Sequence, residues 1–202
     1  MEKIKYLLIG AGGHARVILS IIEKSRQKVL GIFDKEGFKK NLDNIPVIGD
    51  YDKNVFSEAK VIIAIGDNFA RKKIASNIYH KFGVIIEKSA CIDNLTKIGL
   101  GSVIFHKSLI QRGSIIGKHC IINSNSSIDH DCIIEDFVHI APGVVLCGNV
   151  NVGSCTLIGA GSTIIQNIKI GKNVIVAAGS VVVSDIPDGV KVMGVPAKIV
   201  VK

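Results

Sequence analysis

The sequence predicts two parts, a small parallel α/β domain over residues 1–85 and a parallel β-helix over residues 86–202. Two observations lead to this prediction. In the second part an aliphatic residue recurs at every sixth position, with glycine or a small residue at fixed places between. In the first part short apolar runs alternate with segments of helical pattern, and a glycine-rich turn follows the first run.

The first part is expected to contain three strands and two helices. The strands are expected at residues 5–9, 29–33 and 61–65, with one helix after residues 10–15 that ends near Lys24 and another over residues 69–79. Strands that alternate with helices along the chain are typical of a parallel sheet. A ligand of such a sheet binds beyond the carboxyl ends of the strands.

The glycine-rich turn predicts a nucleotide site at that edge. It carries Gly10, Gly12 and the small Ala15 in the spacing of a dinucleotide-binding fingerprint. Asp34 follows the second strand, where a ribose contact would lie, and residues 66–68 follow the third strand. The domain is too short for a full dinucleotide fold, so one nucleotide in a small Rossmann-like domain is favoured. The alternative is a tight turn into a helix.

The six-residue period of the second part runs without a break through residues 86–182. Its members are Ile86, Ile92, Ile98, Ile104, Ile110, Ile116, Ile122, Ile128, Ile134, Ile140, Leu146, Val152, Ile158, Ile164, Ile170, Val176 and Val182. Small or β-branched residues often stand four positions later: Ser102, Ser108, Ser114, Cys120, Ser126, Cys132, Thr156, Ser162 and Ser180. In a β-helix three hexapeptides make one coil of roughly eighteen residues, and the aliphatic side chains stack inside. The proline- and glycine-bearing segment 185–198 is expected to cap the end.

Composition limits the classes of partner. The formal net charge of +8 favours anions, but no basic run interleaved with aromatic residues indicates nucleic acid, so phosphorylated small molecules fit better. The first apolar run is too short for a membrane span, so no stable membrane insertion is expected. Five cysteines without paired spacing favour a reducing cytoplasm over a disulfide framework.

His130 is the strongest candidate for catalysis. It lies between Asp129 and Asp131 at an outward-facing position of its hexapeptide. A neutral imidazole accepts a proton near pH 7, and an adjacent carboxylate orients it and raises its basicity. The alternative is a solvated surface histidine, and the acidic neighbours favour a general base. His139, nine residues further on, is expected at another outward-facing position.

The other histidines and the basic segment 71–73 indicate no clear functional site. The remaining histidines share no metal-ligand spacing, so no metal site is expected: His14, His80, His106 and His119. Arg71, Lys72 and Lys73 have two readings, a phosphate clamp or the charged face of a helix, and the second is favoured.

Together these motifs resemble a known family. They are IGAGGHA at 9–15, FD at 33–34, AIGDNFARKK at 64–73, HDCIIEDFVHIAPG at 130–143 and GVPAK at 194–198. Over essentially the whole chain they resemble the bacterial sugar O-acyltransferases of the sialic acid O-acetyltransferase (NeuD) type. Within that family they resemble the enzymes that N-acetylate a UDP-4-amino sugar in bacillosamine synthesis. The resemblance implies a left-handed β-helix, a homotrimer, and acetyl-CoA bound in the cleft between adjacent coils.

The resemblance also implies roles for individual residues. His130 would be the general base, and Asp131 the acidic neighbour that modulates it. Acetyl-CoA would contact His139, Gly148, Ala160 and Ala178, and the nucleotide sugar would be held by Gly12, Gly13 and His14, with Asp34 and Gly66 nearby. Asp131 stands where relatives often have Glu, which shortens the reach to the imidazole. Lys35 stands where the UDP-amino-sugar enzyme has a second Asp, which leaves UDP or GDP open.

The expected reaction is direct transfer of an acetyl group from acetyl-CoA to the amine of a UDP- or GDP-linked 4-amino sugar, for a bacterial surface glycan. His130 would take the proton of the amine, and backbone N–H groups such as that of Gly148 would stabilise the oxyanion. Two alternatives remain open. One is O-acetylation of a sialic acid or a related sugar, and the other is a non-catalytic trimer that binds sugar nucleotides.

Overall fold

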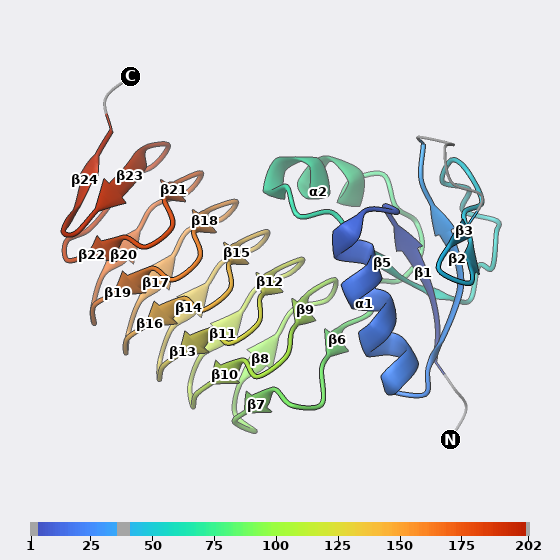
Figure 1. The fold of residues 1–202 in the computed structure, drawn as a ribbon, viewed down its shortest axis with the longest axis horizontal. Coiled ribbons are helices and arrows are strands. Elements are labelled where there is room, and N and C mark those ends of the chain that lie inside the picture. Colours follow the sequence, from blue (N-terminus) through green and yellow to red (C-terminus); the bar gives the residue numbers. More distant parts are fainter. Residues whose placement is uncertain (1–3, 36–40, 201–202) are drawn as a thin grey trace. The chain divides into compact units, whose positions relative to one another are not determined.

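The computed structural model describes residues 4–35 and 41–200 of the chain. It divides into two compact units, residues 1–85 and 86–202, each of which is described by itself (Figure 1). No helix among the described residues is long and apolar enough to cross a membrane.

The first unit is built on a three-stranded parallel sheet with β1 in the middle. β1 (Lys5–Ile9) pairs with β2 (Lys28–Phe33) on one side and with β5 (Lys60–Ile63) on the other. Helix α1 (Gly13–Lys24) connects β1 to β2, α2 (Asn68–Ala75) follows β5, and β3 (Asn41–Leu42) pairs antiparallel with β4 (Ile45–Pro46). Every residue of β1 except the first is buried, which is typical of a strand covered on both faces. The predicted parallel sheet is confirmed.

Helix α2 ends at Ala75, earlier than predicted. The side chains of Ser76 and Asn77 hydrogen-bond the carbonyl oxygen of Lys73, at 2.8 and 3.0 Å. Short polar side chains that bind a neighbouring carbonyl in this way compete with the helical hydrogen bonds. The helical pattern of residues 69–79 therefore stops within its last turn.

The second unit is a parallel β-helix of about six turns. Its first sheet contains β7 (Cys91–Ile92), β10 (Leu109–Ile110), β13 (Ser127–Ile128), β16 (Val145–Leu146), β19 (Thr163–Ile164) and β22 (Val181–Val182). Its second contains β8 (Lys97–Ile98), β11 (Ile115–Ile116), β14 (Ile133–Ile134), β17 (Asn151–Val152) and β20 (Lys169–Ile170). Its third contains β6 (Ile85–Ile86), β9 (Val103–Ile104), β12 (Ile121–Ile122), β15 (His139–Ile140), β18 (Leu157–Ile158), β21 (Ile175–Val176), β23 (Lys191–Gly194) and β24 (Ala197–Ile199).

The register confirms three hexapeptides in each coil. Leu109 pairs with Ser127, and Ser127 with Val145, so each strand lies beside the one that follows it by three hexapeptides. The repeat ends where β23 pairs in parallel with β21 but antiparallel with β24. This change of direction ends the coil, and the segment 185–198 forms its cap.

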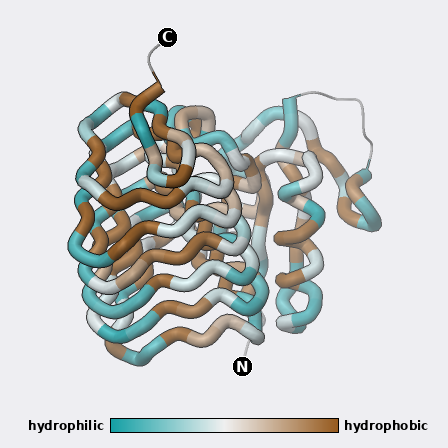
Figure 2. Tube along the Cα trace, turned by 60° about the vertical axis from the view of Figure 1, so that its left-hand side comes forward, coloured by the Kyte–Doolittle hydropathy of each residue, from teal (hydrophilic) through white to brown (hydrophobic). Residues whose placement is uncertain are grey.

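The aliphatic series forms the core of the β-helix, as predicted, over most of its length. From Ile104 to Val182 every member is at most 3% exposed, and Figure 2 shows apolar residues at matching places in successive coils. The start of the series is a correction, because Ile86 is 44% exposed and Ile92 and Ile98 are only partly buried. These three belong to β6, β7 and β8, the end strands of the three sheets, so no earlier coil covers them.

The small residues between the aliphatic positions tie adjacent coils together at the turns. Ser114 is fully buried; its Oγ donates to the carbonyl of Asp129 at 2.7 Å and accepts the N–H of Cys132 at 3.1 Å. Cys132 has the same place one coil later, and its Sγ lies 3.3 Å from the carbonyl oxygen of Cys147. Burial raises the pKa of the Cys132 thiol to about 11, so it packs and does not act as a nucleophile near pH 7.

Candidate active site

The turns between the first and second sheets form one edge of the β-helix, here called the dyad edge. Successive coils place residues 112–113, 130–131, 148–149 and 166–167 on it. Backbone hydrogen bonds join these turns: Asp131 N to Arg112 O at 3.0 Å, Asn149 N to His130 O at 2.9 Å and Asn167 N to Gly148 O at 3.0 Å. His130 and Gly148 are therefore neighbours in adjacent coils.

His130 and Asp131 form a hydrogen-bonded pair on the dyad edge. Nδ1 of His130 lies 2.9 Å from Oδ2 of Asp131, and the two side chains are 58% and 67% exposed. Asp131 has φ of +58°, a left-handed conformation that Asp and Asn tolerate better than most residues. The shorter Asp131 thus reaches the imidazole. With Nδ1–H donated to the carboxylate, Nε2 is the nitrogen that can accept a proton.

The electrostatic setting of His130 favours proton uptake. Its pKa is raised above the ordinary value of 6.5, first by the hydrogen bond to Asp131 and next by the charge of Asp129. Asp129 also accepts the backbone N–H of His130 at 2.8 Å through Oδ1, which holds the turn. A base whose pKa lies near the working pH is the one best suited to general base catalysis.

Gly148 lies directly beside the imidazole. A Cβ on Gly148 would stand 2.6 Å from both Nε2 and Cε1 of His130, closer than real Cβ contacts allow. Any larger residue would displace the ring. Gly148 therefore lies against the ring of the candidate base.

The other residues expected to contact acetyl-CoA lie elsewhere on the β-helix. His139 begins β15 and is half-buried, with Nε2 3.2 Å from Nδ2 of Asn123. Ala160 and Ala178 are exposed on the edge after β18 and β21, where Gly179 N donates to Ala160 O at 2.8 Å. Within one chain the structure does not bring these residues to the dyad edge.

In the first unit the predicted nucleotide residues gather at the carboxyl edge of the sheet. Because β1 lies between β2 and β5, the turn after β1 has Asp34 on one side and residues 64–68 on the other. Asp34 accepts the N–H of Ala11 through Oδ2 at 2.5 Å. Gly10 has φ of +103°, and a Cβ there would stand 3.1 Å from Ala64 O, so this position requires glycine.

Gly12 and Gly13 form the start of α1 and are exposed. Gly12 is the N-cap residue and makes no side-chain cap, and the first turn of the helix carries no acidic residue. A Cβ on Gly12, Gly13 or Gly66 would meet nothing within 4 Å, so the edge is open there. A helix N-terminus that presents backbone N–H groups in this way suits a phosphate.

Arg71 corrects both readings of the basic segment. It is only 1% exposed, so it is neither part of a solvated helix face nor an open phosphate clamp. Its guanidinium donates to the carbonyls of Ile65 and Gly66 at 3.0 Å each and to Oδ1 of Asn68 at 2.7 Å. Arg71 therefore fixes the loop that carries Gly66.

The supporting contact between Arg71 and Asn68 was not predicted, although their i, i+3 spacing on a helix is visible in the sequence. His14 is a further part of this cluster. Its pKa is lowered to about 4, first by burial and then by the charge of Arg71, so its imidazole is neutral near pH 7. Lys72 and Lys73 are exposed, as the helix-face reading predicts.

His80 and His119 lie in different surroundings. His80 lies 2.8 Å from the hydroxyl of Tyr51, and the ring of His119 stacks on Phe137 at 4.9 Å. In residues 4–35 and 41–200 no group of three or more His, Cys, Asp or Glu side chains could hold a metal ion.

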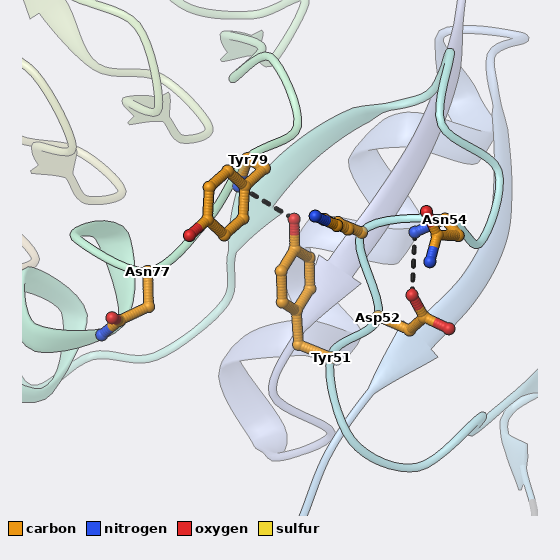
Figure 3. Close-up of a pocket in the computed structure, with 6 residues that line it drawn as sticks. Tyr51, Asp52, Asn54, Asn77 and Tyr79 are labelled. Carbon is orange, nitrogen blue, oxygen red and sulfur yellow. Dashed lines mark hydrogen bonds between the residues drawn. The ribbon is translucent and has the colours of Figure 1, made fainter.

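A surface hollow of about 300 Å³ lies in the first unit (Figure 3). Its lining residues are Tyr51, Asp52, Lys53, Asn54, Asn77 and Tyr79. The hydroxyl of Tyr51 accepts the backbone N–H of Tyr79 at 2.9 Å, which ties the two walls together. None of the catalytic or binding residues predicted from the sequence lines this hollow, so the hollow is not part of the candidate active site.

Comparison with known proteins places the chain in a family. Residues 5–78 match the PglD N-terminal domain, and residues 113–148 match the bacterial transferase hexapeptide family (six repeats). A comparison with curated proteins found no match.

Solved structures extend the similarity to the whole chain. The chain is 32% identical to a histidine-to-asparagine mutant of perosamine N-acetyltransferase from Caulobacter crescentus in complex with CoA and GDP-perosamine, with a TM-score of 0.94 over 98% of this chain and 97% of that one. It is 33% identical to the acetyltransferase domain of PglB from Neisseria gonorrhoeae, with a TM-score of 0.90 over 97% and 99%. The complex of that domain with acetyl coenzyme A matches at 32% identity and a TM-score of 0.90, over 98% and 100%. The chain belongs to the hexapeptide-repeat acyltransferase superfamily and carries a PglD-type N-terminal domain.

Proposed function

We propose that this chain is an acetyl-CoA-dependent N-acetyltransferase that acts on the amine of a nucleotide-linked 4-amino sugar. The observation that carries the proposal is the His130–Asp131 pair on a hexapeptide β-helix. A perosamine N-acetyltransferase bound to CoA and GDP-perosamine matches this chain over nearly its full length. An N-acetyltransferase of this kind needs a general base and the thioester of acetyl-CoA, and His130 of this chain can serve as the base.

The proposed mechanism is a direct attack. The amine of the sugar attacks the thioester carbonyl of acetyl-CoA while Nε2 of His130 takes its proton. The C–N bond forms, the C–S bond breaks, and CoA leaves as a thiolate that is protonated by the imidazolium or by water. Backbone N–H groups near Gly148 stabilise the oxyanion of the tetrahedral intermediate. Asp131 holds the tautomer that leaves Nε2 free for this role.

We assign the acyl donor to the small-residue edge of the β-helix. Ala160 and Ala178 are exposed there, and a Cβ on Gly161 or Gly179 would meet nothing within 4 Å, so a long, thin ligand fits against the backbone. His130 lies on a different edge of the same chain, the dyad edge. A donor held against Ala160 and Ala178 would therefore reach His130 of another copy. The proposal therefore includes a homotrimer in which adjacent subunits share each site.

Exposed apolar residues support this assembly. Ile115 and Ile133 are 41% and 45% exposed, and they lie on the adjacent strands β11 and β14. Val145, which is 39% exposed, begins β16 of the first sheet and lies on a different face from these two isoleucines. Neighbouring exposed isoleucines of this kind are typical of a surface that another protein surface covers.

The first unit is assigned to the nucleotide of the acceptor. The open N-terminus of α1 would receive the phosphates, and Asp34 and Gly66 lie at the same sheet edge. The net charge of +8 suits two anionic substrates. Five free cysteines agree with a reducing cytoplasm, where nucleotide sugars and acetyl-CoA would be available.

The test is an acceptor panel with acetyl-CoA. Release of the CoA thiol is followed with UDP- and GDP-linked 4-amino sugars, with the same nucleotide sugars that carry a hydroxyl in place of the amine, and with free sialic acid. We expect turnover only with a nucleotide-linked amine. Turnover with sialic acid or a hydroxyl alone would establish O-acetylation instead. Tight binding of nucleotide sugar without any thiol release would point to a non-catalytic protein.

A further inference from the structure

We infer that Gly113, one coil before the catalytic pair, is a positioning residue that leaves room for the carboxylate of Asp131. The inference rests on the proposed function, in which His130 is the base. It concerns a residue whose added Cβ would meet Asp131 first, and which acts through that side chain.

Gly113 and Asp131 have the same place in adjacent coils of the dyad edge. The backbone N–H of Asp131 donates to the carbonyl of Arg112 at 3.0 Å, which fixes the two turns against each other. A Cβ on Gly113 would overlap Oδ1 of Asp131 and stand 3.3 Å from its Cγ. The carboxylate whose Oδ2 holds Nδ1 of His130 therefore lies over the bare Cα of Gly113.

Backbone conformation does not by itself require glycine at this place. Gly113 has φ of +78°, but Asn149 and Asn167 have the same place in later coils with φ of +59° and +65°. Asparagine is thus accepted at this turn of the same β-helix. What distinguishes position 113 is the carboxylate that packs over it.

Two glycines therefore flank the pair. Gly113 leaves room for the carboxylate in the coil before, and Gly148 leaves room for the imidazole in the coil after. A side chain at position 113 moves the flexible end of Asp131, which costs the fold little, but the hydrogen bond to His130 is then lost. Asp129 and Asp131 on its own turn are the charged groups that act on the imidazole. Arg112 is the charged residue at positions 112–113 of the preceding turn, and Gly148 and Asn149 on the following turn are uncharged.

The experiment compares Gly113→Ala in two backgrounds. In the wild-type background the pKa of His130, measured by NMR titration, should fall toward 6.5, and kcat should fall at least as far as in Asp131→Asn. In an Asp131→Gly background, where no carboxylate remains to be displaced, adding Gly113→Ala should change neither quantity. Asp131→Gly suits this purpose because glycine accepts the positive φ of +58°.

Two further variants separate positioning from strain. Gly189→Ala meets the same backbone strain, with φ of +73° and nothing within 4 Å of its Cβ, and should leave the pKa of His130 and kcat unchanged. Gly113→Asn, a residue that this turn accepts at positions 149 and 167, should reproduce the effect of Gly113→Ala in a folded protein.

Equal loss of kcat from Gly113→Ala in both backgrounds, or an unchanged pKa of His130 in Gly113→Ala and Gly113→Asn, would overturn the inference. The proposed function fails separately, if wild-type protein transfers no acetyl group to any amino sugar. The NMR titration still decides the role of Gly113 in that case, because it needs no substrate.

Discussion

His130 is held through contacts of its imidazole and its backbone with its two sequence neighbours. Asp131 takes Nδ1–H, and Asp129 binds the backbone N–H of the same residue. These contacts come from adjacent residues, which is why the sequence could predict the pair. The glycines that make room for it, Gly113 and Gly148, lie one coil before Asp131 and one coil after His130, so the coil length brings them to the pair. The directions of the side chains, which make glycine necessary at both places, are not visible in the sequence.

Asp131→Asn should shift the pH dependence of kcat. The carboxylate of Asp131 is the largest cause of the raised pKa of His130, so its removal lowers that pKa. A general base must be neutral, and a lower pKa keeps the imidazole neutral to lower pH. The acidic limb of the kcat–pH profile should therefore move to lower pH, while maximal kcat falls less than in His130→Ala. An acidic limb that stays in place would show that Asp131 does not set the basicity of His130.

His14 should make the stability of the first unit depend on pH. Its pKa in the folded state is about 4, below the ordinary value of 6.5, so the unfolded chain binds the proton more tightly. The contribution of neutral His14 to the free energy of unfolding is fully present above pH 6.5. It is lost as the pH falls toward 4, and the difference between the two pKa values corresponds to about 3 kcal/mol. Urea unfolding of wild type and His14→Gln at several pH values checks this. Parallel curves for the two proteins would contradict the assignment.

The sequence predicts some structural elements more reliably than others. A six-residue aliphatic period over sixteen intervals leaves no other regular fold, so the coil and its register were predictable. Ile86, Ile92 and Ile98 fit the same period but lie on end strands, and a local pattern cannot reveal which coil has no neighbour. Arg71 looked solvated for a similar reason, since its partners are carbonyls of a loop whose shape the sequence does not display.

The start of helix α1 should accept the nucleotide of the acceptor. Gly13→Trp places a large ring where a Cβ meets nothing within 4 Å, so the fold should tolerate it while the phosphate site is blocked. The Kd for the nucleotide sugar should rise at least tenfold, and the Kd for acetyl-CoA should stay the same, both by calorimetry. Val17→Trp, at a 40% exposed position one turn further along α1, is the matched control and should change neither Kd. Loss of both affinities in folded Gly13→Trp would refute this division of labour.

The whole molecule is proposed to work as a trimer, because Ala160 and His130 lie on different edges of one chain. Sedimentation of wild type at micromolar concentration should give the mass of three chains. Ile133→Asp puts a charge on an exposed position of β14 and leaves the buried Ile134 in place, so each chain should stay folded while the trimer weakens. Turnover should fall with the fraction of trimer. A monomer with full activity would contradict the shared site.

The rate of amide formation on a nucleotide-linked 4-amino sugar, compared between wild type and His130→Ala, decides whether the chain is an N-acetyltransferase with His130 as its base. His130 is a 58% exposed side chain outside the aliphatic core, so the variant should keep its fold, its assembly and its affinity for acetyl-CoA. General base catalysis contributes about 10²- to 10⁴-fold, and kcat should fall by that factor. Wild type that leaves the amine unmodified would refute the proposed activity, and a folded His130→Ala protein that acetylates the amine at the wild-type rate would refute the role of His130.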